Sequence, residues 1–223
     1  MHALNLVIFD QFRAGCSVRD ILLSAQSPAD PVTQRGNPKM RISDDRYTRD
    51  RLRFDLALRF MRHEARTHTI RKWTGLTDDR IRKLYRSYLT MTPSHVARHR
   101  GKSPGQASFF LRAPRVQQES AVLASLFCLL GVMPTSVIVD EEHPLPGVAR
   151  GERLCQAFEA YLMLVPASQI TFEHAVLLVN ELARGIELRL DDCVGCGGLV
   201  VVDRLTLRNA RCGRCSGVPR FDA

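Results

Sequence analysis

Long apolar runs are missing from this chain of 223 residues, although 45% of its residues are hydrophobic. The longest uncharged apolar stretch, Ala121 to Val139, is interrupted by Gly131 and Pro134, so we expect no membrane-spanning helix. A secretory signal is missing as well, because the apolar stretch from His2 to Phe9 is short, lacks a basic flank and precedes no small-residue cleavage site. These absences favour a soluble globular protein.

Catalytic motifs are also missing. The chain contains no H-E-x-x-H pair, no G-x-S-x-G elbow and no G-x-G-x-x-G loop. Gly101, Lys102 and Ser103 have the ending of a phosphate-binding P-loop, but its first glycine and the preceding strand are absent. The seven histidines are scattered without the spacing of a metal site. We therefore expect no enzymatic activity.

The seven cysteines do not suggest the disulfide framework of a small secreted protein, because their number is odd and no secretory signal precedes them. Cys128 and Cys155 lie within apolar helical patterns, where a free cysteine packs as a small hydrophobic residue. We assign no chemistry to these two cysteines.

Four other cysteines form two closely spaced pairs near the C-terminus. Cys193 and Cys196 make one C-x2-C pair, and Cys212 and Cys215 make a second pair after a gap of fifteen residues. Two such pairs at this distance are typical of a structural zinc site, and the glycines beside them permit the tight turns it needs. Because four thiolates leave no open coordination position, we expect one structural Zn²⁺. Iron in the same cage and a metal-free dithiol pair are the alternatives.

The residues between the two pairs predict the rest of this C-terminal unit. Residues 199–202 and 204–208 read as two strands joined by a turn at Asp203, so we expect a four-cysteine zinc ribbon over residues 191–217. Arg211 and Arg214 would offset the negative charge of the metal centre or, alternatively, contact phosphate.

The formal net charge of +9 is concentrated in one third of the chain. Residues 46–115 hold eighteen Lys and Arg against five Asp and Glu, a net charge of +13, whereas residues 1–45 are neutral and residues 116–223 carry −4. A basic block of this size favours binding to nucleic acid through release of phosphate counterions. A solvated, arginine-rich surface is the alternative.

The basic block has helical periodicity. A helix is expected from Arg51, with Phe54, Leu58 and Met61 on its apolar side, followed by a short helix over residues 67–74. Gly75 ends that helix, and Thr77 is a suitable N-cap for the next one, which buries Ile81, Leu84, Tyr85 and Tyr88. Helix, glycine-containing turn and helix is the order of a helix-turn-helix motif.

The second helix of this motif carries basic residues on its other sides, as a DNA recognition helix requires. The preceding helix and the basic loop at residues 90–116 add further cations. Arg71 stands where helix-turn-helix motifs usually have a small residue, and a surface helix pair without a DNA role is the alternative. The candidate DNA-contacting residues are Arg71, Lys72, Thr77, Arg80, Arg82, Lys83, Arg86, Arg100 and Lys102.

The remaining segments complete a mainly α fold: a helical bundle with a helix-turn-helix-like segment and a C-terminal zinc ribbon held by four cysteines. Residues 1–45 read as an N-terminal extension without packed structure, and Met40 leaves open that translation begins there. Residues 46–190 are expected to form the helical domain, with helices over 117–130, 152–164 and 171–184, the last closed by Gly185, and a strand over 186–190. The helix at 117–130 is apolar nearly all round, so we expect part of its surface to need a partner.

These segments, taken in order, resemble the FlhC family of flagellar transcriptional activator subunits. The resemblance rests on residues 65–85, the loop Gly101–Gly105 leading to Phe109 and Phe110, the helix before Cys193, and the two cysteine pairs. It implies a cytoplasmic regulator that assembles with an FlhD-like subunit, binds promoter DNA and recruits RNA polymerase. It also implies one zinc ion per chain on Cys193, Cys196, Cys212 and Cys215.

Two other functions fit the residues. One is a protein-interaction module in which the zinc ribbon and the basic surface serve only assembly. The other is an RNA-binding zinc-ribbon protein without promoter specificity.

Overall fold

The computed structural model describes residues 42–91, 99, 101–133, 147–207 and 209–216. The expected N-terminal extension up to residue 41, the acidic loop around Asp140 and the candidate Arg100 lie outside the described residues.

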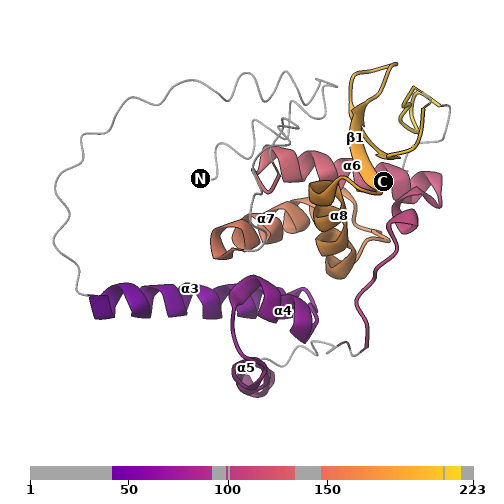
Figure 1. Ribbon diagram of the computed structural model, residues 1–223. Helices are drawn as coiled ribbons and strands as arrows, with labels where there is room; N and C mark the ends of the chain where they lie inside the picture. The colour runs from indigo at the N-terminus through magenta and orange to yellow at the C-terminus, as the bar shows by residue number, and fades with distance from the viewer. Residues whose placement is uncertain (1–41, 92–98, 100, 134–146, 208, 217–223) are drawn as a thin grey trace, which may run out of the picture.

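The described residues form six α-helices, one 3-10 helix and a two-stranded sheet, which confirms the mainly α fold class (Figure 1). In chain order the elements are α3 (Ile42–Arg62), α4 (Thr67–Thr74), α5 (Asp78–Met91), η1 (Ala107–Leu111), α6 (Pro114–Leu129), α7 (Val148–Leu164), α8 (Phe172–Arg184), β1 (Leu188–Asp192) and β2 (Leu199–Asp203).

Several helix boundaries agree with the sequence pattern. Helix α4 spans the expected residues and ends at Gly75, whose φ of 70° is the left-handed conformation that glycine adopts most easily. Gly185 ends α8 in the same way, with a φ of 59°. The N-terminus of α8 is fixed by a capping box between Thr171 and His174.

Other boundaries differ from the prediction. Helix α3 begins at Ile42 rather than near Arg51, because the apolar stripe that marks a helix starts only where α3 packs on the core. The stretch at 90–116 was expected to be a loop, but it includes η1 and the start of α6, where Pro114 occupies the first turn. Helix α7 likewise begins at Val148 instead of Glu152.

Aromatic rings form the centre of the core between α3, α4, α7 and α8. The ring of Phe172 lies 4.9 Å from Phe60 and 5.2 Å from Phe158, both edge to face. Trp73 of α4 adds a ring 6.1 Å from Phe60, and His63 stacks on Phe172 at 5.1 Å. These contacts attach α4 to the rest of the bundle.

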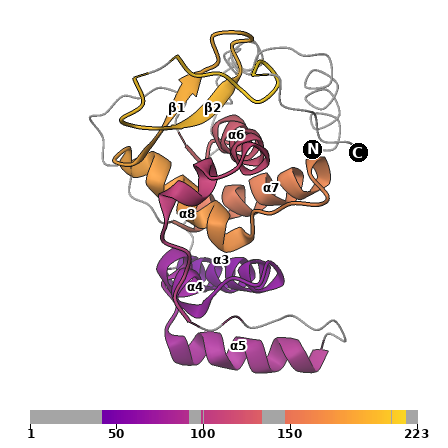
Figure 2. The ribbon, with the colours of Figure 1, turned by 90° about the vertical axis from the view of Figure 1, so that its right-hand side faces the viewer.

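Helix α6 lies between α7 and the strands, in the part of the molecule away from α5 (Figure 2). Its large apolar side chains are buried or half-buried, and none is among the exposed large hydrophobic residues of the described part. The expected exposed stretch on this helix is therefore not found among the described residues, because β2 packs against α6. Glu119 is fully buried there, with its carboxylate bonded to Arg115, Tyr161 and the Gln169 N–H.

The sheet differs from the expected ribbon. Of the two strands predicted between the cysteine pairs, only β2 forms within the described residues, and its antiparallel partner is β1, which precedes the first pair. Leu188 faces Asp203 and Asp192 faces Leu199. The residues after β2 turn instead, because the Asp203 carboxylate accepts from the Leu205 N–H at 2.7 Å. Leu188 and Val201 join the main core, so the hairpin is part of the helical body.

Candidate metal centre and basic surface

The four cysteines of the two C-x2-C pairs come together in space. The Sγ atoms of Cys193, Cys196, Cys212 and Cys215 all lie within 4.8 Å of one another. The Sγ atoms of Cys196 and Cys212 are 3.7 Å apart. Tetrahedral zinc with Zn–S bonds of about 2.3 Å requires sulfur atoms about 3.8 Å apart, so this arrangement is compact enough to bind one metal ion.

The hairpin loop and its backbone position the first pair. Cys193 directly follows β1, and its N–H donates to the Gly198 carbonyl while its carbonyl accepts from the Gly197 N–H, both at 2.8 Å. Gly197 has a φ of 69°, which closes this turn. A side chain at Gly195 would place its Cβ 2.9 Å from the Cys215 sulfur, so any larger residue there would force the second pair to shift.

Hydrogen bonds and burial make the four thiols unequal. Burial raises the pKa of Cys193, but backbone N–H groups, including that of Cys212 with its nitrogen 3.3 Å from the sulfur, lower it overall to about 6. Hydrogen bonds with the three neighbouring thiols raise the pKa of Cys215 to about 12. Four thiolates at this distance repel one another, and a bound cation removes that repulsion. The donor set therefore fits a soft divalent metal with no position left for water.

The second pair is attached to α6. A side chain on Gly213 would overlap Gln118 of α6, with its Cβ 1.9 Å from the amide nitrogen. The neighbouring Gln117 donates to the Val201 carbonyl of β2 at 3.4 Å. Cys193 also packs with Val200, Val202 and Ala210 in a small cluster separate from the main core. The second cysteine pair thus lies against α6, and the first pair adjoins the hairpin.

The basic candidates of α5 lie at the other end of the molecule from the hairpin (Figures 1 and 2). Ile81 and Tyr85 are buried, and the Tyr85 hydroxyl donates to the Ala65 carbonyl at 2.9 Å. Helical geometry then places Arg82, Lys83 and Arg86 on the outer side, and all three are exposed. We call these three residues the outer face of α5.

Of the other described candidates, three contact other parts of the protein and two are exposed. Arg71 forms an ion pair with Asp78 at 3.8 Å, and Arg80 lies 4.0 Å from Asp50 and over the Phe54 ring. Thr77 caps α5, its hydroxyl accepting from the Arg80 N–H at 3.5 Å. Lys72 lines a cleft between α4 and α8. Lys102 is exposed in the segment that follows residue 100.

The structure adds basic residues of α3 that are not among the candidate DNA-contacting residues. Arg46 and Arg53 are exposed and lie one turn before and after Asp50, the residue of α3 that faces Arg80. Both arginines belong to the basic block of net charge +13, which was the signal that the sequence offered. The packing of α3 beside α5 was needed to place them near Arg80.

No helix within the described part of the chain is both long and apolar enough to cross a membrane. Comparison of the chain with protein-family models finds no match, and comparison with curated proteins finds none either.

Proposed function

We propose that this protein is a DNA-binding subunit of a transcriptional activator of flagellar genes, which acts in a heteromeric complex with an FlhD-like subunit and recruits RNA polymerase. The observation that carries the proposal is the outer face of α5. This helix follows a glycine-ended helix in helix-turn-helix order and presents Arg82, Lys83 and Arg86 to solvent.

The charge of this face favours a phosphate backbone as partner. Arg82 has one acidic neighbour, Asp79, at 3.0 Å on the same helix, whereas no ion pair involves Lys83 or Arg86 among the described residues. An exposed ion pair of this kind contributes about 0–1 kcal/mol, so DNA phosphates can replace Asp79 at little cost. Each phosphate neutralised on duplex DNA raises the salt dependence of binding by about 0.9 in a log–log plot.

The metal centre has a supporting role in this proposal. We infer zinc as its metal, because the centre offers four cysteine thiols and no other ligand type. Its distance from the outer face of α5 favours a structural or subunit-binding role over direct DNA contact. The resemblance to the FlhC family supports both inferences.

A second function is favoured by one observation. Leu205 and Leu207, in the segment between β2 and the second cysteine pair, are 85% and 99% exposed. Exposed leucines on a metal-stabilised loop are typical of a protein-binding surface, so a protein-interaction module is the second candidate.

The proposal is tested by gel shifts with a flagellar promoter fragment, using this chain with and without the FlhD-like subunit. We expect the triple variant Arg82→Ala, Lys83→Ala and Arg86→Ala to weaken promoter binding at least tenfold. Arg184→Ala on α8 is the matched control, because Arg184 is 62% exposed and pairs with Glu181 three residues away, as Arg82 pairs with Asp79.

Equal effects of the triple variant and the control would contradict the proposal. Competition by unrelated RNA as strong as by promoter DNA would favour the RNA-binding alternative. Loss of subunit assembly with unchanged DNA binding would favour the protein-interaction module.

A further inference from the structure

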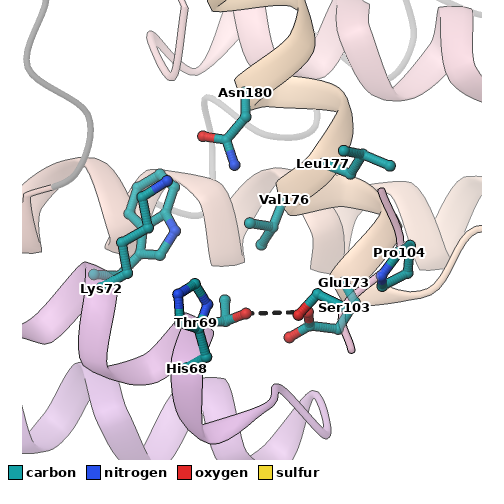
Figure 3. A pocket seen from close by; sticks show the side chains of 10 residues that line it. His68, Thr69, Lys72, Ser103, Pro104, Glu173, Val176, Leu177 and Asn180 are labelled. Carbon is teal, nitrogen blue, oxygen red and sulfur yellow. Dashed lines mark hydrogen bonds between the residues drawn. The ribbon is translucent and has the colours of Figure 1, made fainter. Parts of the chain in front are cut away.

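A small cleft lies between α4 and α8. His68, Thr69, Lys72 and Trp73 of α4 line one wall, and Glu173, Val176, Leu177 and Asn180 of α8 line the other, with Ser103 and Pro104 at one end. Figure 3 shows Lys72 and Asn180 at one end of the cleft and Glu173 beside Ser103 and Pro104 at the other. The cleft therefore has a cationic end and an acidic end.

The wall of this cleft contains a hydrogen-bond donor without an acceptor. Trp73 is only 2% exposed, and its indole Nε1–H has no hydrogen-bond partner. The indole nitrogen is a donor only, so nothing but an acceptor atom can satisfy it. Leaving a buried donor unsatisfied costs about 1–3 kcal/mol, and such groups are rare in folded proteins.

The acidic end of the cleft is already occupied by donors of the protein. The carboxylate of Glu173 accepts from the Thr69 hydroxyl at 3.0 Å and from the Arg66 backbone N–H at 2.8 Å. Lys72 differs, because no ion pair involves it among the described residues and its side chain is exposed. Within the described residues, the cleft therefore lacks an anionic acceptor that Lys72 and the indole N–H of the next residue of α4, Trp73, could both contact.

We propose that this cleft binds a small organic carboxylate. Its carboxylate oxygens would accept from the Lys72 ammonium, the Trp73 indole N–H and the Asn180 amide, and a short apolar body would pack on Val176 and Leu177. The flexible Lys72 side chain would turn toward the ligand and uncover the indole beside it. The inference concerns α4 and α8 alone and stands whether or not α5 binds DNA.

Trp73 is the only tryptophan of the chain, so it reports on this cleft directly. The full chain gives one indole Nε1–H resonance in a ¹⁵N–¹H spectrum, which needs no assignment. We would titrate sodium propionate as the probe, propionamide as an uncharged molecule of the same shape, and sodium chloride at equal ionic strength. A ligand of this size is expected to bind with a dissociation constant on the order of millimolar.

We expect propionate to shift the indole resonance in a saturable way. Propionamide should bind at least about tenfold more weakly, because it cannot form the charge-assisted hydrogen bond. Lys72→Met keeps the aliphatic stem and should weaken propionate binding about tenfold. Lys83→Met on α5 is the matched control and should leave propionate binding unchanged.

An indole resonance that does not move, or that moves equally with propionamide or in Lys72→Met, would overturn the proposal. Circular dichroism of both variants checks that they are folded.

Discussion

The guanidinium of Arg59 in α3 donates two hydrogen bonds to the carboxylate of Glu159 in α7, from Nε at 2.9 Å and from Nη2 at 2.6 Å. His63, which directly follows α3, contacts the same carboxylate at 2.9 Å, and Glu152 also binds Arg59. Burial raises the pKa of Glu159, but the donors from Arg59 and His63 lower it below its ordinary value. This carboxylate therefore joins α3, which carries α4 and α5, to the rest of the bundle.

We predict that Glu159→Gln lowers the free energy of unfolding by about 1–2 kcal/mol, since it removes a bidentate charged pair that is only partly shielded from solvent. Urea denaturation measures this change. Glu152→Gln is the control and should cost less, because Arg59 keeps both hydrogen bonds to Glu159. A larger loss in Glu152→Gln than in Glu159→Gln would contradict this assignment.

A second prediction concerns the turn of the first cysteine pair. Gly195→Ala places a Cβ 2.9 Å from the Cys215 sulfur and 3.1 Å from its Cβ, so the two pairs must move apart. Overpacking of this kind costs about 1–3 kcal/mol, which corresponds to a loss of about 5- to 150-fold in metal affinity. Competition with a chelator measures that affinity.

Gly198→Ala is the matched control for this turn. Its Cβ would lie 3.5 Å from the Cys196 sulfur, an ordinary contact, so metal affinity should change little. If both variants bind metal like the parent chain, the cysteine pairs are not held together through Gly195.

Removing the metal is expected to affect one part of the protein. Cys193, Cys212 and Cys215 pack with Val200, Val202 and Ala210 in a cluster of their own, whereas the helices share a separate core. We predict that elemental analysis finds one metal ion per chain. A chelator should expose residues 193–216 to proteolysis, while the helical circular dichroism signal largely persists. Cooperative loss of the helical signal on chelation would instead show that the whole fold depends on the metal.

The fold prediction from sequence succeeded where the signal is local. Gly75 and Gly185 mark helix ends because a left-handed residue is required there, and the cysteine spacing alone located the four clustered thiols. The prediction failed where contacts between distant segments determine the structure. The partner of β2 is a strand on the other side of the first cysteine pair, and this pairing is set by packing of Leu188 and Val201 on the helical core. The cleft between Lys72 and Asn180 has no local signature at all.

The N-terminus of α8 gives a pH-dependent prediction. The Nδ1 of His174 lies 2.8 Å from the Thr171 hydroxyl, and it accepts from the Thr171 N–H, which a protonated Nδ1 cannot do. Burial, and then the nearby Arg112 charge, lower the pKa of His174. A histidine with a lowered folded pKa contributes stability that is present above its unfolded pKa and is lost as the pH falls through the folded pKa.

Acidification from about pH 7.5 to about pH 5 should therefore lower the melting temperature of the parent chain more than that of His174→Gln. Glutamine at this position retains a capping-box acceptor without a titrating group. Thermal melts of the two proteins across this range give the difference, in which the other titrating groups cancel. Parallel melting curves at all pH values would mean that His174 does not contribute to the acid sensitivity.

The final prediction separates DNA contact from helix packing on α5. Lys83 is exposed on the outer face, whereas Arg80 lies 5.6 Å from the centre of the Phe54 ring and pairs with Asp50 of α3. Lys83→Ala should lower the slope of log affinity against log salt for promoter DNA by about 1, with no loss of thermal stability. Arg80→Ala should lower stability by about 0.5–1 kcal/mol, because it removes a cation–π contact between α3 and α5. A stability loss in Lys83→Ala with an unchanged salt slope would place the phosphate contacts on another surface, of which the exposed Arg46 and Arg53 of α3 are the next to test.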